Sequence, residues 1–241
     1  MSAGKPLWAV VPVKQFAAAK SRLAPVLETS ERAELARLMF EDVLDALMAC
    51  PDILAGVAVV TADRAAAEAA RRHGARVVLA VADHGINAAI VGAVEAIDPG
   101  AEDGLMVVPS DIPQVTRNAF AQAAAAISAP RSVAIAAAAE DGGTNLYACR
   151  PARVLPPRFG PRSFEQHCRA AMAAGIGAQV LHVPELALDI DRPGDLRTFQ
   201  ALRSSTRTQA FLSRLRIADR LDNDRHAMRQ PNGRAVAEVT S

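Results

Sequence analysis

A regular alternation of short apolar runs with longer segments of helical periodicity constrains the fold of this chain more than any other feature. The first run, Leu7–Val13, is almost entirely apolar, which is typical of a strand buried on both faces of a sheet. Comparable runs follow at residues 56–60, 76–80, 105–108, 133–139, 145–149 and 179–183. Strands that alternate with helices form βαβ units, so the sequence predicts an α/β fold with a doubly wound, mainly parallel sheet.

Helical patterns lie between these runs. The first helix is expected to begin at Thr29 or Ser30, where a hydroxyl can cap it, and apolar residues recur at helical spacing as far as Leu47. A second helix is expected from the TAD segment (residues 61–63) to about Gly74. Further helices are expected over residues 87–97, from the PSDIP segment through Ile127, and over residues 164–174 and 195–202. Aromatic residues make up only 4% of the chain, and alanine supplies much of its apolar content, which favours closely packed helices.

The character of the chain changes after Arg203. Residues 1–203 are expected to form one α/β domain, whereas residues 204–241 are polar and charged. One amphipathic stretch in this C-terminal part carries Phe211, Leu212, Leu215, Ile217 and Leu221. It predicts one exposed helix followed by a loose terminus, and a solvated tail is favoured over a contact with RNA or membrane.

Charge and cysteine usage exclude several classes of protein. With 27 basic and 26 acidic residues, the chain has no global field that would attract nucleic acid or an anionic membrane. Its three cysteines have no C-x-x-C spacing, which favours reduced thiols over a zinc or redox motif. The apolar run before Lys14 is too short for a signal peptide or a membrane span, so a cytoplasmic location is expected.

Acidic residues follow two of the apolar segments. Ligands of an open parallel sheet bind at the carboxyl ends of its strands, and Asp111 lies there in VVPSDIP. Asp189 and Asp191 point to the same side of an extended segment, where their like charges repel unless a cation holds them. These carboxylates predict a Mg²⁺ site. The alternatives are that Asp111 caps the next helix or turn, and that Asp191 caps the helix that contains Pro193.

Three cations, Lys14, Lys20 and Arg22, lie in the loop after the first strand. Such a loop can wrap a triphosphate, although the cluster alone favours solvated loop cations. The pattern is neither a P-loop nor a dinucleotide-binding fingerprint, because no glycine occurs between Gly4 and Gly56.

Two glycine-containing loops, residues 140–145 and residues 158–164, complete the set of polar clusters. Thr144, Ser163 and the N–H groups that begin the Ser163 helix can donate hydrogen bonds to a phosphate, although both loops can equally be ordinary turns. Asn87 heads a helix, where it can cap the helix or contact a base. The remaining candidates are interpreted as structural or surface histidines: His73, His84, His167 and His182.

Together these motifs resemble the 2-phospho-L-lactate guanylyltransferase family of deazaflavin coenzyme biosynthesis. The matching stretches occur in family order over residues 7–203: VPVK, AKSRLAP, VVTAD, HGINAAI, VVPSDIP, GGTN, FGPRSF and LDIDRPGDL. The resemblance implies a nucleotidyltransferase domain of the nucleotide-diphospho-sugar transferase (GT-A-like) type over residues 1–203. It further implies Mg²⁺-dependent transfer of GMP from GTP to the phosphate of a small phosphorylated carboxylic acid, with release of pyrophosphate, and it is compatible with a homodimer.

The resemblance also implies a role for each matching residue. GTP phosphates would contact Lys14, Lys20 and Arg22, and the metal ligands would be Asp111, Asp189 and Asp191. The reaction itself would depend on Lys20, Arg22 and Asp111. The phosphate or carboxylate of the acceptor would contact Thr144, Gly160 and Ser163, and Asn87 would lie near the nucleoside.

The chain departs from the family pattern at two positions. Ile86 replaces a usual leucine, and Arg162 stands where the family commonly has glycine in FGPGSF. The arginine adds a bulky cation beside the acceptor loop, which leaves 2-phospho-L-lactate, phosphoenolpyruvate and 3-phospho-D-glycerate open as acceptors.

Other functions remain as alternatives. Nucleotidyltransferases of the molybdenum-cofactor or sugar-phosphate type usually carry a glycine-rich loop after the first strand, and glycosyltransferases more often carry a D-x-D motif near mid-chain. A non-catalytic nucleotide-binding module would not need acids at the ends of its strands. An acceptor phosphate is already ionised at neutral pH, so the lack of an evident general base favours transfer to a phosphate.

Overall fold

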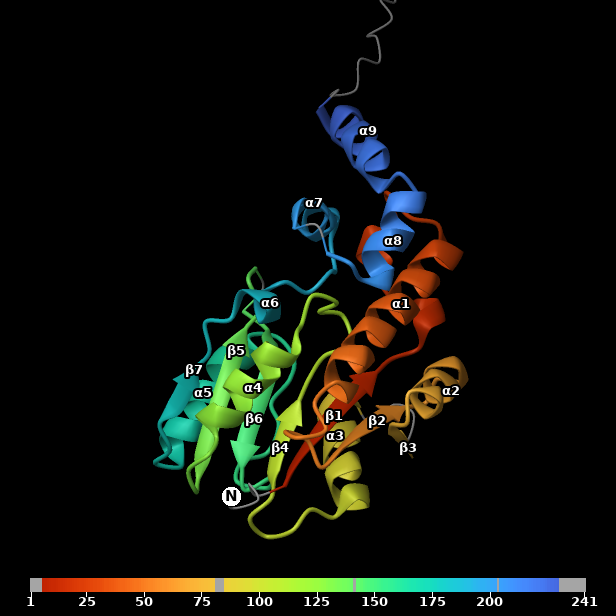
Figure 1. The fold of residues 1–241 in the computed structure, drawn as a ribbon. Helices are drawn as coiled ribbons and strands as arrows, with labels where there is room; N and C mark the ends of the chain where they lie inside the picture. The colour runs from red at the N-terminus through yellow and green to blue at the C-terminus, as the bar shows by residue number, and fades with distance from the viewer. Residues whose placement is uncertain (1–5, 81–84, 141, 203, 230–241) are drawn as a thin grey trace, which may run out of the picture.

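The computed structural model describes residues 6–80, 85–140, 142–202 and 204–229, with side chains described as far as residue 224 (Figure 1). Its central sheet has seven strands among these residues, in the order β3-β2-β1-β4-β6-β5-β7. The strands are β1 (Leu7–Val13), β2 (Gly56–Thr61), β3 (Arg76–Leu79), β4 (Gly104–Val107), β5 (Ser132–Ala137), β6 (Thr144–Arg150) and β7 (Ala178–Val180). Only β6 runs antiparallel to its neighbours, which confirms the predicted mainly parallel sheet.

Helices cover both faces of the sheet, as the doubly wound prediction requires. Strand β1 is buried on both sides: Ala9 and Val11 belong to one apolar cluster and Val10 to the other. The first cluster packs under α1 (Thr29–Met48), α2 (Arg64–Arg72), α4 (Arg117–Ala126) and α6 (Pro184–Ala187). The second packs under α3 (Gly85–Ile97) and α5 (Ser163–Ala173).

The connections of β1 and β4 diverge at the carboxyl edge of the sheet. Strand β1 pairs with β2 on one side and with β4 on the other, so the strand order reverses between β1 and β4. Loops that leave the sheet at such a point separate and open a crevice, which is where open α/β sheets bind ligands. The loop after β1 contains two short 3-10 helices, Phe16–Ala18 and Ser21–Leu23.

The C-terminal segment differs from its prediction. Instead of one exposed helix, α8 (Arg207–Arg214) and α9 (Ile217–Arg229) follow α7 (Pro193–Ala201). The change of direction occurs at Arg216, whose backbone is left-handed (φ 49°), a conformation that commonly ends a helix. The apolar side chains predicted to line one exposed helix are therefore split between two helices.

The apolar sides of these helices are buried, whereas their polar sides are exposed. Phe211 and Leu212 of α8 and Leu221 of α9 are buried in a third apolar cluster together with Leu35 and Met39 of α1. A single short amphipathic helix is marginally stable in water, so its apolar face is stable only when it is packed against another element. In Figure 1, α7, α8 and α9 gather beside one end of α1.

Long-range capping fixes the start of α8. The carboxylate of Asp42, on α1, accepts hydrogen bonds from the backbone N–H groups of Arg207 and Thr208 and from the Thr208 hydroxyl, at 2.9, 2.9 and 2.6 Å.

Across the described residues, no helix is long and apolar enough to cross a membrane.

A pair of leucine substitutions tests this packing. Leu212→Ala is expected to lower the free energy of unfolding by about 2–5 kcal/mol, because the Leu212 side chain is fully buried. Leu202→Ala, at a side chain that is 53% exposed, should change it by less than about 0.5 kcal/mol. Urea unfolding of both variants measures the difference, and equal effects would contradict the packed arrangement.

Candidate active site

The loop after β1 is anchored to the end of β2 by Asp63. Its carboxylate accepts a hydrogen bond from the backbone N–H of Phe16 (2.9 Å) and another from Ala66 (3.0 Å), which caps α2. The Phe16 ring is buried against Phe40, with ring centroids 5.9 Å apart. The VVTAD motif therefore holds the cation-bearing loop, while Lys14 at its start remains exposed.

Lys20 lies between the predicted acids. Its ammonium donates to Asp111 at 2.6 Å and lies 3.7 Å from Asp191, and its side chain is only 8% exposed. Arg22, which is 58% exposed, pairs with the other oxygen of Asp191 at 2.5 Å. Burial lowers the pKa of Lys20, but the carboxylates of Asp111, Asp191 and Asp189 outweigh it and hold that pKa above its ordinary value.

The two acidic segments are also joined through the backbone. The N–H of Ile190, between Asp189 and Asp191, donates to the carbonyl of Asp111 at 3.1 Å. This contact brings the loop after β4 against the segment that leads into α7. The three predicted metal-ligating acids are thus gathered at the carboxyl edge of the sheet.

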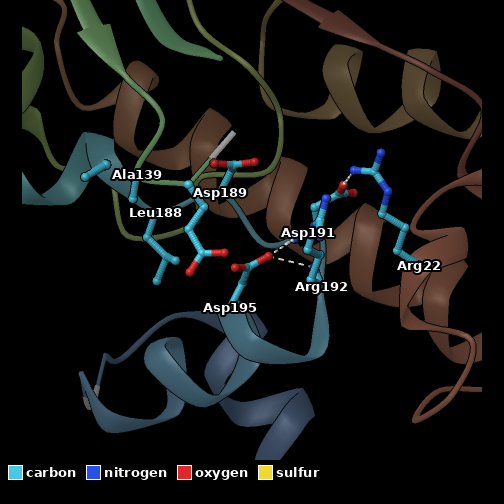
Figure 2. Close-up of a pocket in the computed structure, with 9 residues that line it drawn as sticks. Arg22, Ala139, Leu188, Asp189, Asp191, Arg192 and Asp195 are labelled. Atoms are coloured by element: carbon cyan, nitrogen blue, oxygen red, sulfur yellow. Dashed lines mark hydrogen bonds and ion pairs between the residues drawn. The ribbon is translucent and has the colours of Figure 1, made fainter. Parts of the chain in front are cut away.

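Neither alternative role for these acids as a helix cap is correct. Helix α4 is capped by Thr116, whose hydroxyl accepts from Ala119, and not by Asp111. At the start of α7 the backbone N–H groups of Asp191 and Arg192 donate to Asp195, at 2.8 and 2.6 Å. Figure 2 shows Asp195 directed at this backbone and Asp191 directed at Arg22. Both carboxylates, Asp111 and Asp191, are therefore directed at cations.

Asp189 has a different partner, which the sequence analysis missed. The side-chain amide of Asn145, which is buried, donates to Asp189 at 3.1 Å and to the carbonyl of Ala187 at 3.2 Å. Thr144 and Asn145 are adjacent in β6 and so face opposite sides of the sheet. The sequence could have indicated this role of Asn145, because Asn145 is a polar residue next to Thr144 in a buried strand.

Asp189 and Asp191, but not Asp111, line a small pocket beside Arg22 (Figure 2). Its wall is formed by Arg22, Ala139, Glu140, Ala187, Leu188, Asp189, Asp191, Arg192 and Asp195. Carboxylate oxygens are the donors that Mg²⁺ takes from proteins, one or two at a time, with water and substrate phosphate completing its shell. Among the described residues, no group of three or more His, Cys, Asp or Glu side chains could hold a metal ion by itself. The carboxylate oxygens present are of the donor type that Mg²⁺ accepts beside phosphate and water.

The two glycine-containing loops contact each other through their backbones. The N–H of Phe164 donates to the carbonyl of Gly142 (3.2 Å), and the N–H of Ser163 donates to Gly160 (3.1 Å). These two N–H groups, expected to donate to a phosphate, already have carbonyl partners, and the Ser163 side chain is buried. Asp141 of this loop and His84 lie outside the described residues.

Asn87 holds the second of these loops. It accepts from the backbone N–H of Phe159 at 2.8 Å and donates to the carbonyl of the same residue at 2.9 Å. It therefore does not cap α3, which begins at Gly85. Its contact with a nucleoside stays a prediction.

His167 forms hydrogen bonds to both loops. Its Nε2 accepts from the backbone N–H of Arg158 (2.9 Å), so in the neutral ring the proton is on Nδ1, which donates to the Thr144 hydroxyl oxygen (3.1 Å). The ring stacks on Tyr147 and meets the edge of Phe159. Its interpretation as a structural histidine is confirmed, and it also fixes the rotamer of a predicted substrate contact.

The protonation of His167 predicts a pH-dependent stability. Burial, followed by the charge of Arg158, lowers the pKa of His167 to about 4, below its ordinary value of 6.5. As the pH falls, the unfolded chain therefore binds this proton at a higher pH than the folded chain does. The free energy of unfolding should consequently fall by about 3 kcal/mol between pH 6.5 and pH 4. Urea unfolding should show a smaller fall over this range in His167→Gln. The exposed His182→Gln is the control and should keep the wild-type difference; an equal change in both would contradict the assignment.

Most of the chain is similar in sequence to known proteins. A family model described as "Guanylyl transferase CofC like" matches residues 7–230. The phosphoenolpyruvate guanylyltransferase of Sphaerobacter thermophilus is 39% identical over 78% of this chain and 89% of that protein. The 3-phospho-D-glycerate guanylyltransferase of Phenylobacterium zucineum is 34% identical over 86% and 96%, and the 2-phospho-L-lactate guanylyltransferase of Methanothermobacter thermautotrophicus is 31% identical over 87% and 91%.

Solved structures support the fold. A protein from Desulfovibrio desulfuricans G20, assigned as a nucleotide-diphospho-sugar transferase, superposes with a TM-score of 0.73 at 18% identity, covering 91% of this chain and 98% of that one. A CMP:2-keto-3-deoxy-manno-octonic acid synthetase superposes with a TM-score of 0.53 at 16% identity, covering 82% and 98%. The predicted nucleotide-diphospho-sugar transferase type of fold is confirmed. With the family match over most of its length, the chain belongs to the CofC-like guanylyltransferases.

Proposed function

We propose that this protein transfers GMP from GTP to the phosphate of a small phosphorylated carboxylic acid and releases pyrophosphate, as a step of deazaflavin coenzyme (F420) biosynthesis. Membership of the family and the names of the relatives support this activity. The observation that carries it is the contact of Lys20 with Asp111 and Asp191, which places cations and acids together at the carboxyl edge of β1 and β4.

The cations suit the donor. Nucleotidyl transfer involves little covalent chemistry by the protein, so positioning and charge neutralisation supply most of the rate enhancement. The loop after β1 carries all three cations, Lys14, Lys20 and Arg22, which can contact successive phosphates of GTP. Arg22 is exposed enough to move toward a ligand, and its guanidinium suits a phosphate better than a point charge does.

The acceptor needs no general base. Its phosphate is ionised at neutral pH, so one of its oxygens forms the new bond to the α-phosphorus while the bond from that phosphorus to the bridging oxygen breaks and pyrophosphate leaves. The neutral His167 has both ring nitrogens engaged by Arg158 and Thr144, which fits a positioning role. Thr144, Gly160 and Ser163 are proposed to contact the acceptor, with its carboxylate and phosphate as the recognised groups.

We assign Mg²⁺ as the cofactor, held by Asp111, Asp189 and Asp191. The ion would supply positive charge against the phosphates that react. The protein residues would hold and orient the two substrates around it. A homodimer and a cytoplasmic location remain predictions.

The activity can be tested with three acceptors in parallel. Purified protein with GTP and Mg²⁺ is expected to release pyrophosphate with phosphoenolpyruvate, 3-phospho-D-glycerate or 2-phospho-L-lactate, and mass spectrometry should find the guanylylated acid. Asp111→Asn should lower kcat/KM at least about 100-fold, the scale on which one preorganised electrostatic group acts. Asp98→Asn is the matched control, because Asp98 is exposed and precedes β4 at the opposite edge of the sheet.

Two outcomes would contradict the proposal. Near-normal activity of Asp111→Asn would remove the acid from the reaction. Absence of pyrophosphate release with every acceptor, in a folded protein that binds GTP, would favour a non-catalytic nucleotide-binding module. Release with a sugar phosphate or a molybdenum-cofactor precursor in place of these acids would favour another nucleotidyltransferase.

Arg162 provides a test of the acceptor loop. Its backbone is left-handed (φ 53°), a conformation that glycine adopts without the strain of a side chain, so Arg162→Gly should fold normally. Loss of the exposed cation beside the acceptor loop should raise the KM for the acceptor severalfold and leave the KM for GTP unchanged. Steady-state kinetics with each substrate varied separately measures both; a change confined to GTP would place Arg162 on the donor side.

A further inference from the structure

The cations assigned to GTP are bonded to the acids assigned to the metal. Lys20 contacts Asp111 at 2.6 Å and approaches Asp191 at 3.7 Å, while Arg22 contacts Asp191 at 2.5 Å. Each group is therefore paired with a partner that it must give up when a metal–nucleotide complex binds. Lys14, in the same loop, has no such partner among the described side chains.

Lys20 is held in this position by its surroundings. Its side chain is 8% exposed, and its backbone has φ 56° and ψ 38°, the left-handed region that is unfavourable for a residue with a side chain. Leu23, the last residue of the short helix that follows Lys20, is fully buried in the apolar cluster that includes Ile190. Because Ile190 lies between Asp189 and Asp191, one packed core fixes both the ammonium and the acids.

An ammonium at this place competes with a divalent cation. It takes a carboxylate oxygen that the metal would need, and its charge repels a second cation at short distance. A triphosphate removes this competition, because it offers the ammonium another anion of high charge.

We propose that Lys20 is a resident counter-cation that blocks the acid cluster to divalent metal until a nucleotide triphosphate draws its ammonium away. The inference rests on the proposed function in taking the metal and GTP as the ligands. It makes binding of the two cooperative, because each ligand frees the partner that the other requires. Metal would then enter together with the nucleotide instead of occupying the site beforehand.

The test measures metal binding without nucleotide or turnover. The full chain is titrated with Mn²⁺, a spectroscopic substitute for Mg²⁺, and free Mn²⁺ is read by electron paramagnetic resonance. Lys20→Gln is expected to bind Mn²⁺ at least about tenfold more tightly than the wild type, within the usual range of site-to-site coupling.

Lys14→Gln is the matched control. It removes the same charge from the same loop, but at an exposed residue that does not contact the acids. A general electrostatic effect would move both variants alike, whereas the proposed block requires a change of no more than about twofold in Lys14→Gln, since exposed charges are screened. Lys20→Arg, which keeps the charge, should bind Mn²⁺ as weakly as the wild type.

Circular dichroism first establishes that Lys20→Gln is folded. If it is not, Arg22→Gln carries the test, because the side chain of Arg22 is 58% exposed and its loss frees an oxygen of Asp191; a smaller gain, about threefold, is expected. Equal Mn²⁺ affinity of wild type and variants would overturn the inference, as would the absence of Mn²⁺ binding to all of them. Guanylyl transfer by the wild type, assayed separately, then decides whether the proposed function stands without the block.

Discussion

The ion pair between Lys20 and Asp111 joins the two loops on which the crevice depends. One loop follows β1 and the other follows β4, and the connections of these neighbouring strands diverge where the strand order reverses. A buried ammonium needs a carboxylate partner, and this carboxylate follows a fully buried strand with no polar residue of its own. The contact therefore holds the two loops together and places positive and negative groups where a phosphate and a metal would meet.

The C-terminal helices support this arrangement. Arg220 of α9 forms a two-point contact with Glu31 of α1, at 2.6 and 2.9 Å, and donates to the carbonyl of Val26 at 3.3 Å. Val26 lies at the end of the loop that carries Lys20 and Arg22. Partly exposed ion pairs of this kind contribute modestly to stability. The larger effect is geometric, because the helices enclose the apolar cluster that holds the cation loop against the acids. Residues far along the chain thus belong to the framework of the site.

The sequence predicted what depends on local patterns. Apolar runs predicted the sheet, and strand-end acids predicted that Asp111, Asp189 and Asp191 would gather at one edge. It did not predict contacts that only the tertiary structure creates. Asn145 was missed because its partner is 44 positions away, and the two C-terminal helices were merged because one amphipathic pattern continues through the left-handed turn at Arg216.

The different partners of Asp189 and Asp191 separate two acids that are indistinguishable in the sequence. Asp191 contacts two cations, Lys20 and Arg22, which neutralise it and must leave before it can ligate a metal. The Asn145 amide fixes one oxygen of Asp189 with a neutral hydrogen bond, so this partner orients the carboxylate without neutralising it. The charge of Asp189 nevertheless acts on the nearby Lys20, together with the charges of Asp111 and Asp191. If the proposed metal binds here, Asn145 would orient Asp189 in advance, and Asp191 would become a ligand only after Lys20 and Arg22 move away from it.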